Sequence, residues 1–466
     1  MGAEGYFRLL QVKRQTERAS FESFVAKRFQ PQTPPGNPSK FLWTSQIDED
    51  LYQRRRVKIT VWGINYDPEP TGIGPFNTDL CKWLASRGHS VTMLSTFPYY
   101  PWWKKRPEDA GKWHERSVTD GVIVHRCWHY VPEKPSTLKR LLHELSFVAT
   151  STWRALCTPT PDVYFVVSPS LFLGIGAFVA SRVSRRPFVF HVQDLQPDAA
   201  LGLGMIKPGL SVKLLYMLER WSYGRAALVS GISQGMMDAY RRKGVPEEKI
   251  YLFPNWIPDE PPAGVADGQA AASFRREYGL APQTPLIAYS GNLGVKQGLD
   301  VVVEAARGGV DAHWAICGEG AAKPVLEAAI AAAPDCGARL YPLQPDDRYR
   351  ALLREADVNL ITQQRGTGQF FFPSKLLSIL QYGRPVLAVA DESSELARAT
   401  REGGFGVVVA PGDVAGLREA ARTIIRASAE QKAEWAQRGR AWVDQFRRSR
   451  VLGEFEQRLA RVAGAV

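Results

Sequence analysis

The sequence lacks most features of secreted, zinc-binding and membrane-spanning proteins. Its cysteines are odd in number and show no CxxC spacing, so they indicate a reducing cytoplasm rather than a disulfide framework or a zinc ribbon; they are Cys81, Cys127, Cys157, Cys317 and Cys336. Residues 1–56 contain no apolar core of a signal peptide. They include the proline-rich segment PQTPPGNP, and we therefore expect an appended, loosely ordered arm.

One uncharged run, residues 163–181, approaches the length of about 20 residues that a membrane-spanning helix needs. Its first part, residues 163–167, is β-branched and aromatic, and a Ser-Pro-Ser turn follows. Residues 171–181 suit a helix that runs into a cluster of arginines. The run therefore predicts a buried strand and a helix instead of a membrane span.

The composition is that of a folded protein with a surplus of basic residues. A chain of 466 residues exceeds what one hydrophobic core usually supports, which predicts two large domains or three small ones. The 59 Lys and Arg residues against 47 Asp and Glu give a formal charge of +12. This charge favours an anionic partner, which can be phosphate, nucleic acid or an acidic membrane surface.

Strand and helix patterns alternate from Val57 onward. Residues 57–62 predict a strand, residues 76–88 a helix, and residues 90–95 a second strand. Further apolar runs extend this first sheet at residues 164–167, 188–191 and 227–230. After a proline-rich stretch at 254–262 the pattern restarts, with strands expected at residues 285–290, 313–317, 357–361, 386–390 and 406–409.

This alternation predicts an α/β fold with right-handed crossovers. We expect two facing Rossmann-like domains, each a parallel sheet with helices on both faces, at residues 57–257 and 258–428. Residues 429–466 should form one helix, roughly 429–463, that crosses back to the first domain. Ligands of such folds bind beside the carboxyl ends of the strands.

A glycine-rich loop follows the first predicted strand. In NYDPEPTGIGP, Gly72, Ile73 and Gly74 precede a helix, where backbone N–H groups and the helix dipole favour an anion. A dinucleotide fingerprint would place GxGxxG directly after the strand and an acidic residue after the second strand. Neither is present, so NAD binding is not expected. Taken alone, the loop is equally compatible with an ordinary turn.

Three further motifs with anion-binding character lie in the second half. AYSGNLGVKQG combines Gly291 and Asn292 with Lys296, which offers a diphosphate close backbone approach and one positive charge. ICGEG places Gly318 and Glu319 after the next strand. In FFFPSKL, Ser374 and Lys375 present a hydroxyl, an ammonium and free N–H groups in the first turn of a helix. The alternative for Lys296 is an ordinary solvated lysine.

Six segments, in order, resemble the WcaI-like branch of glycosyltransferase family 4: GINYDPEPTGIG, FPYYPWW, HVQDLQPDA, GNLGVKQGLD, CGEG and PSKLLSILQYGRPVLAV. The resemblance runs from about Val57 to about Gly412. It implies a GT-B fold, an acceptor-side N-terminal domain, and a UDP- or GDP-linked sugar donor held mainly by the C-terminal domain. It also implies retention of anomeric configuration and no cofactor or obligatory metal ion.

The resemblance assigns roles to particular residues. His191 falls where the family has a histidine facing the donor sugar, and Lys296 falls beside the phosphate-binding lysine, with Gln297 as the alternative for that position. The usual pair of glutamates is missing, so Ser374 and Lys375 are the predicted replacements. His191, Lys296 and Lys375 are therefore the expected catalytic residues.

Other residues are expected to bind the two substrates. The donor-binding set is Gly72, Ile73, Gly74, Gly291, Asn292, Gly318, Glu319 and Ser374, although Asn292 stands where many family members have arginine. The acceptor-side set is Asp194, Tyr99 and Trp102.

The expected activity is hexosyl or deoxyhexosyl transfer to a lipid-linked or oligosaccharide acceptor in bacterial exopolysaccharide or lipopolysaccharide O-antigen biosynthesis. Two alternatives are a nucleotide-sugar epimerase of the same fold and a degenerate, non-catalytic nucleotide-sugar-binding subunit.

Metal-like patterns are weak. His125, Cys127 and His129 alternate and would lie on one face of a strand, but no fourth ligand is apparent. The acidic run at residues 48–50 belongs to the expected arm. We predict no metal site.

The stretch of residues 99–113 interleaves tryptophans with lysines and an arginine, which suits an anionic bilayer and also a single-stranded nucleic acid. The next predicted helix, residues 138–156, carries a row of leucines that can face either a membrane or the core. We expect a cytoplasmic protein, peripheral to the inner face of the plasma membrane, with no nucleic-acid partner.

Overall fold

The structure is a computed structural model that describes residues 56–464, except 71, 135, 203–208, 261–272 and 369–373. Two sheets with helices on both faces organise this part of the chain, and the predicted α/β fold class is confirmed. We call the sheet β1–β8 with its helices the N-terminal lobe, and the sheet β9–β14 with its helices the C-terminal lobe. The expected arm lies outside the described residues except for Arg56, as does most of the linker that we expected after residue 260.

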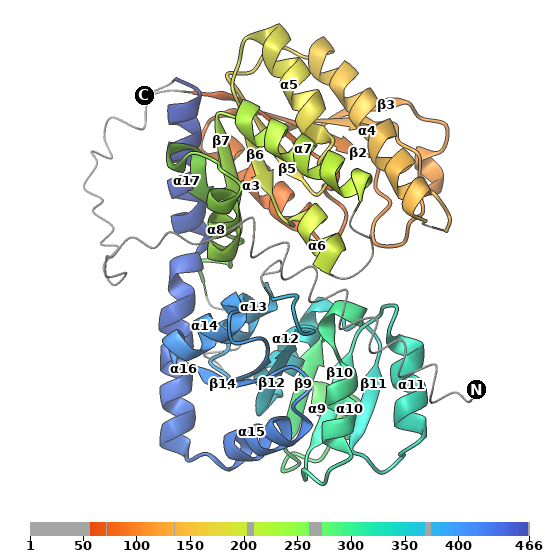
Figure 1. Cartoon of the computed structure of the whole chain (residues 1–466), viewed down its shortest axis with the longest axis vertical. Coiled ribbons are helices and arrows are strands. Elements are labelled where there is room, and N and C mark those ends of the chain that lie inside the picture. The colour runs from red at the N-terminus through yellow and green to blue at the C-terminus, as the bar shows by residue number, and fades with distance from the viewer. Residues whose placement is uncertain are drawn as a thin grey trace. The chain divides into compact units, whose positions relative to one another are not determined.

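The N-terminal sheet has eight strands in the order β3-β4-β2-β1-β5-β6-β7-β8 (Figure 1). Its neighbouring strands are parallel except for the antiparallel pair β3 and β4. The strands are β1 (Lys58–Gly63), β2 (Ser90–Thr96), β3 (His114–Thr119), β4 (Val122–Cys127), β5 (Val163–Ser168), β6 (Phe188–Val192), β7 (Leu228–Gly231) and β8 (Ile250–Leu252). The helices are α3 (Gly74–Ser86), α4 (Thr137–Cys157), α5 (Leu173–Ser184), α6 (Gln196–Gly202), α7 (Leu210–Arg225) and α8 (Gln234–Arg242), with short 3-10 turns η1 (Pro107–Asp109) and η2 (Glu247–Lys249).

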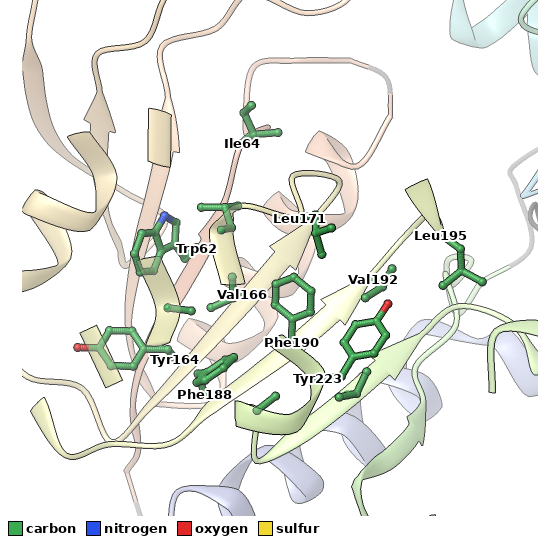
Figure 2. Packing of buried hydrophobic residues seen from close by; sticks show 14 of the residues in the cluster. Trp62, Ile64, Tyr164, Val166, Leu171, Phe188, Phe190, Val192, Leu195 and Tyr223 are labelled. Carbon is green, nitrogen blue, oxygen red and sulfur yellow. The ribbon is translucent and has the colours of Figure 1, made fainter. Parts of the chain in front are cut away.

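The core of the N-terminal lobe is rich in aromatic residues. Trp62 on β1, Tyr164 on β5 and Phe190 on β6 are almost completely buried in one cluster, in which the Phe190 ring lies next to Tyr223 of α7 (Figure 2). The uncharged run at residues 163–181 is β5, a turn and the start of α5, as expected from the sequence. Among the described residues, no helix is long and apolar enough to cross a membrane.

The C-terminal sheet has six parallel strands in the order β11-β10-β9-β12-β13-β14. The chain reverses its direction of progress across the sheet between β9 and β12, the position at which α/β folds bind ligands. The strands are β9 (Leu286–Ser290), β10 (His313–Cys317), β11 (Ala338–Tyr341), β12 (Val358–Thr362), β13 (Val386–Val389) and β14 (Gly406–Val409). The helices are α9 (Phe274–Glu277), α10 (Asp300–Ala306), α11 (Lys323–Ala331), α12 (Asp346–Glu355), α13 (Lys375–Gln381), α14 (Glu395–Gly403) and α15 (Val414–Arg426), with the 3-10 turn η3 (Val295–Gln297).

The segment expected to be one terminal helix is instead two helices, α16 (Ala429–Val443) and α17 (Arg448–Val462), joined by η4 (Asp444–Phe446). The break has a tertiary cause. The Ile257 N–H donates to the Phe446 carbonyl at 2.9 Å, and the Arg448 N–H donates to the Ile257 carbonyl at 2.8 Å. These bonds take backbone groups that a continuous helix would use internally.

The two terminal helices pack against different lobes. α16 lies against α13 and α14, whereas α17 lies against α3. Phe455 of α17 stacks on Phe253 with a centroid distance of 3.9 Å and also meets Phe165 of β5. The last described helix therefore covers one face of the N-terminal sheet.

Candidate functional site

Two glycine loops meet at the carboxyl ends of β9 and β10. The Gly291 N–H donates to the Cys317 carbonyl at 2.9 Å, and the Leu293 N–H donates to the Glu319 carbonyl at 2.8 Å. Gly318 has φ +149°, and a Cβ there would lie 1.8 Å from the Gly291 carbonyl oxygen. Only glycine permits this approach, so the two loops form one backbone surface.

Lys375, the first residue of α13, reaches across to this surface. Its Nζ donates to the Tyr289 Oη at 3.0 Å and lies 4.1 Å from the centre of the same ring. The Tyr289 hydroxyl in turn donates to the Asn292 carbonyl at 2.8 Å. A Cβ on Gly291, which has φ +139°, would lie 2.4 Å from the Lys375 Nζ. The ammonium group therefore lies directly on the glycine loop.

A second lysine adds to the positive charge. Burial lowers the pKa of Lys375 to about 7, and repulsion from Lys296 contributes to the shift. Burial also lowers the pKa of Lys296, which Asp194, after β6, partly opposes. The pKa of Asp194 is raised by burial, with Lys296 acting against the shift. Lys296 thus feels the Asp194 carboxylate and repels the Lys375 ammonium group, and an anionic ligand would relieve this repulsion.

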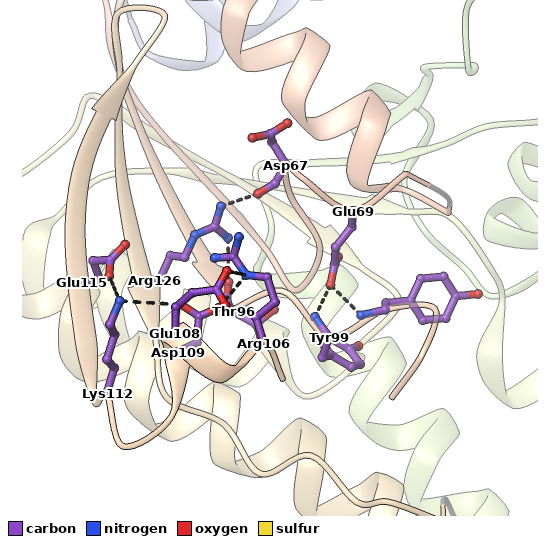
Figure 3. Close-up of polar contacts among 11 residues, drawn as sticks. Asp67, Glu69, Thr96, Tyr99, Arg106, Glu108, Asp109, Lys112, Glu115 and Arg126 are labelled. Carbon is purple, nitrogen blue, oxygen red and sulfur yellow. Dashed lines mark hydrogen bonds and ion pairs between the residues drawn. The ribbon is translucent and has the colours of Figure 1, made fainter. Parts of the chain in front are cut away.

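The loop after β1 is held by a carboxylate that the sequence analysis did not single out. Oε1 of Glu69 accepts from the Tyr99 and Tyr100 backbone N–H groups at 2.9 Å each (Figure 3). Its Oε2 accepts from the Asn65 side chain at 2.7 Å. Burial raises the pKa of Glu69, and these hydrogen bonds oppose the shift. Glu69 therefore ties the loop after β1 to the loop after β2.

Arg126, at the end of β4, extends this bracing. Its guanidinium donates to the Thr96 carbonyl at 2.9 Å and also to the Asp67 carbonyl (Figure 3). Further along the loop after β2, Arg106 is paired with Asp109, 2.8 Å away (Figure 3). The end of β4 is thus fixed to the end of β2 and to the loop after β1.

The predicted donor-binding glycines of the N-terminal lobe lie in this braced loop. Gly72 has φ +70° and is exposed, Ile73 is half-buried, and Gly74 is buried at the start of α3. A Cβ on Gly72 would lie 3.4 Å from the Tyr100 ring. The pKa of Tyr100 is raised by burial and by the nearby charges of Glu69 and Asp194.

His191 lies at the end of β6 and is buried. Its Nδ1 is 2.9 Å from the Ser230 Oγ, and its Nε2 is 2.7 Å from the Gln193 Nε2. Since the Gln193 amide can only donate to Nε2, Nδ1 carries the proton and donates to Ser230. Burial lowers the pKa of His191 to about 3, which keeps the ring neutral. Both ring nitrogens are therefore engaged within the protein.

The three predicted acceptor-side residues differ in exposure. Tyr99 is buried, and its ring packs 5.1 Å from His129 and 4.6 Å from His143. Trp102 is 72% exposed, whereas Asp194 is largely buried and faces Lys296. Tyr100, not Tyr99, is the tyrosine of this pair that approaches the glycine loop.

The remaining predicted donor residues lie around the lysines. Asn292 is exposed, and Glu319 is exposed and paired with Lys323 at 2.9 Å. Ser374 is exposed and makes no capping hydrogen bond to α13. Residues 370–373 of the same motif lie outside the described residues.

The alternating His125, Cys127 and His129 do not form a metal-binding group. His125 lies 2.9 Å from a nitrogen of His114, Cys127 is buried, and His129 packs against Tyr99. Within the described ranges, no group of three or more His, Cys, Asp or Glu side chains is arranged to hold a metal ion.

Several candidate site residues lay beyond sequence reasoning. Glu69 and Gln193 lie within the motifs GINYDPEPTGIG and HVQDLQPDA, but no pattern in those motifs singles them out as site residues. Glu144, on α4, has its pKa raised to about 7 by burial, with Ser170 and Arg140 nearby. The sequence of this amphipathic helix does not indicate that one of its carboxyl groups is buried and has a raised pKa.

Solved glycosyltransferases have the same fold. Sucrose-phosphate synthase from Thermosynechococcus elongatus superposes with a TM-score of 0.69 at 16% identity, covering 88% of this chain and 100% of that one. Anabaena HepE, solved with UDP-glucose, superposes with a TM-score of 0.61 at 16% identity, covering 87% and 100%. WaaG, a glycosyltransferase of lipopolysaccharide biosynthesis, gives 0.60 at 16% identity, covering 87% and 100%. The fold is that of the GT-B glycosyltransferases.

The sequence comparisons are more specific. The family model "Glycosyl transferase 4-like domain" matches residues 71–256, and "Glycosyl transferases group 1" matches residues 284–427. WcaI of Escherichia coli (strain K12), named as a colanic acid biosynthesis glycosyl transferase, is 37% identical over 376 residues, which cover 78% of this chain and 92% of WcaI. The chain belongs to the WcaI-like glycosyltransferases of family 4.

Proposed function

We propose that this glycosyltransferase moves a hexosyl or deoxyhexosyl group, with retention of configuration, from a UDP- or GDP-linked donor to a lipid-linked glycan in exopolysaccharide or O-antigen assembly. The observation that carries the proposal is the pair Lys296 and Lys375 at the glycine loop, where burial and mutual repulsion lower the pKa of Lys375 to about 7. Two neighbouring cations at a glycine loop favour the binding of an anion. The names of WcaI and WaaG support the polysaccharide assignment, and the HepE complex supports the donor class.

The charge distribution suits the departure of a nucleoside diphosphate. Glycosyl transfer develops negative charge on the leaving phosphate, and preorganised cations stabilise that charge most effectively where water is excluded. Lys296 and Lys375 supply two such cations, and the N–H groups of the glycine loops add dipoles. We therefore propose that the enzyme needs no metal ion and no cofactor.

Within this proposal, His191 and Gln193 form a buried pair beside the sugar position. The neutral His191 ring holds the Gln193 amide, which also lies 3.4 Å from the Asn255 side-chain oxygen. We propose that His191 acts mainly by fixing Gln193 and the loop that carries Asp194.

A donor panel tests the function. The full chain is incubated with UDP- and GDP-linked hexoses and a membrane extract as acceptor, and both nucleotide release and labelled glycan are measured with EDTA present. Transfer from one donor with retained anomeric configuration, read by NMR, supports the proposal. Donor epimerisation without transfer would establish the epimerase alternative, and tight nucleotide binding without any turnover would establish the non-catalytic one.

We also propose that the enzyme works at the inner face of the plasma membrane. The leucines of α4 face outward: Leu138 is 67%, Leu142 50% and Leu145 40% exposed, whereas the buried side of the helix carries His143 and Phe147. The alternative of a buried leucine face is thus wrong. Trp102 and Lys104, in the neighbouring loop, are exposed as well. An exposed apolar row beside cations suits reversible contact with an anionic bilayer.

A further inference from the structure

A separate cavity lies in the N-terminal lobe, between the loop after β2 and the segment after β4. Its volume is about 350 Å³, and it is lined by Trp103, Lys104, Lys105, Trp128, His129, Tyr130, Val131 and Glu133. None of the donor motifs contributes to it. Aromatic walls with a few polar groups at this volume are typical of a site for one small ligand.

The cavity contains a cation without an ion pair. The Lys105 Nζ lies 5.3 Å from the centre of the Trp128 ring, and among the described residues it makes no salt bridge. Asp109, whose charge acts on Lys105, is already paired with Arg106 at 2.8 Å. Burial lowers the pKa of Lys105, and Asp109 opposes this only in part. An anionic group in the cavity would neutralise this ammonium.

The cavity also contains a buried polar side chain. His129 is fully buried, and within the described part of the chain neither ring nitrogen has a hydrogen-bond partner. Its pKa lies well below the ordinary value because burial outweighs the nearby Cys127 carbonyl, so the ring is neutral. Because neither ring nitrogen is accessible and the Cys127 backbone lies beside the ring, His129 belongs to the wall of the cavity and does not contact a ligand.

The rings around the cavity are held in place from outside. Trp113 stacks on Trp128 with a centroid distance of 4.8 Å, and the Arg140 guanidinium of α4 lies 5.4 Å from the centre of the Trp103 ring. Among the residues that line the cavity, the cations Lys104 and Lys105 outnumber the carboxylate Glu133. The electrostatic balance of the lining is therefore positive.

We propose that this cavity binds one pyranose unit that carries a negative charge, either a phosphate or a carboxylate, with Lys105 on the charge and the Trp103 and Trp128 rings against the sugar. That this sugar belongs to the acceptor rests on the proposed function. The geometry supports the link, because the Tyr99 ring lies 5.1 Å from His129, and its neighbour Tyr100 contacts the Gly72 loop.

Binding of small probes to the full chain tests the cavity. Glucose 1-phosphate, glucuronate, glucose and inorganic phosphate are titrated and followed by calorimetry and ligand-observed NMR. We expect at least one charged sugar to bind about tenfold or more tightly than glucose and inorganic phosphate, since a charge-assisted contact has roughly that effect. The tighter of the two sugars identifies phosphate or carboxylate as the anionic group. Equal binding of glucose, or equal binding of inorganic phosphate, would overturn the proposal.

Two substitutions at the cavity should act in opposite directions. Lys105→Gln should weaken binding of the charged sugar by about tenfold, and Lys105→Arg should restore most of it. Glu133→Gln should strengthen binding by about two- to threefold, because it removes a like charge. Lys58→Gln, with the same change in net charge on the exposed start of β1, is the matched control. A Lys105→Gln protein that binds as the wild type does would contradict the assignment even if both variants fold.

The results distinguish a failure of the cavity proposal from a failure of the proposed function. If the charged sugar binds but no donor supports transfer, the function fails and the cavity stands. If transfer proceeds while Lys105→Gln changes neither probe binding nor the acceptor KM, the cavity assignment fails and the function stands. In both cases UDP or GDP binding serves as an independent check on the C-terminal lobe.

Discussion

Lys375 combines a buried ammonium group with a contact to a strand-end tyrosine, and this makes its removal informative. Lys375→Ala and Lys296→Ala should each lower kcat by roughly 10²–10³, the range for loss of one preorganised charge stabiliser. Lys213→Ala is the control, since that lysine is exposed on α7 and belongs to none of the proposed site motifs. Steady-state kinetics of all three proteins decide the matter. Unchanged turnover in both site variants, with the fold intact by circular dichroism, would rule out a role for these lysines at the diphosphate.

The pKa of Lys375 leads to a prediction about protons. In the free protein burial and Lys296 lower this pKa to about 7, and a bound diphosphate should raise it again. Donor binding at pH 8 should therefore take up protons, and affinity should fall as the pH rises from about 7 toward 9, because the neutral amine must then be protonated. Calorimetry in Tris and in HEPES measures the uptake. Lys375→Arg, which stays charged, should abolish it. Identical apparent enthalpies in the two buffers would contradict the prediction.

At the scale of single elements, substitutions on and near α4 can distinguish the apolar from the electrostatic contribution to membrane binding. Leu138→Gln with Leu142→Gln should reduce binding to neutral and anionic vesicles alike, since burial of an apolar side chain contributes on the order of 1 kcal/mol or more. Lys104→Gln with Lys139→Gln should reduce binding to anionic vesicles only, at about 1 kcal/mol per charge, and high salt should have the same effect.

The measurement is vesicle cosedimentation of the full chain. Val118→Gln serves as control, because this valine is 59% exposed but lies on β3. Loss of binding in the control to the same degree as in the leucine variant would remove α4 from the proposed docking face.

Glu456 anchors α17 to α3, which makes its charge relevant to stability. Its carboxylate lies 3.0 Å from the His89 ring and accepts from the Trp83 indole at 3.1 Å. Burial alone would raise the pKa of Glu456, but the His89 hydrogen bond and the Arg87 charge lower it. Glu456→Gln should therefore lower the unfolding free energy by about 1–2 kcal/mol.

The lowered pKa also fixes the direction of the pH dependence. The Glu456 contribution is fully present above the ordinary glutamate pKa and is lost as the pH falls through the lowered value. Thermal melts between about pH 7 and about pH 3 test this, with Glu454→Gln as a surface control whose side chain pairs with Arg450. A wild-type melting temperature that falls no further than that of Glu456→Gln on acidification would contradict the assignment.

The same element scale shows where sequence reasoning succeeds. Strands such as β10 and β14 were predicted at their observed bounds, because buried parallel strands are short, continuous apolar runs. Strands β3, β4, β8 and β11 were not in the predicted series, although the alternation of His125, Cys127 and His129 was taken to suit a strand. β3 is a polar edge strand, HERSVT, and β8 has only three residues, so neither carries an apolar period. The break between α16 and α17 depends on Ile257, almost 190 residues earlier, and no local pattern encodes it.

For the candidate site, the sequence could predict that Lys296 and Lys375 lie close together, because both follow strands at the same sheet edge. It could not predict which tyrosine of Tyr99 and Tyr100 turns inward, since this depends on the Glu69 carboxylate between two loops. Nor could it predict that His191 would be enclosed by Ser230 and Gln193, because that requires the register of β6 against β7.

At the scale of the whole molecule, two chain segments connect the lobes, and they are bonded to each other. The segment at Ile257 pairs with the segment at Arg447, and the Arg447 guanidinium donates to the Pro258 carbonyl at 2.9 Å. Asp79 of α3 accepts from the Trp256 indole at 2.7 Å and from Arg448 at 2.8 Å. Each connecting segment is therefore anchored to the N-terminal lobe at the same carboxylate.

The position of α17 also determines the order in which this protein can fold during synthesis. A ribosome delivers every strand of the N-terminal sheet long before Phe455 and Glu456, yet Phe165, Phe253 and Trp83 need those two side chains to be covered. The nascent N-terminal lobe thus exposes an aromatic face while the whole C-terminal lobe is being made. Chaperones that recognise exposed aromatic surface would have this interval in which to bind, and it ends only when α17 leaves the ribosome.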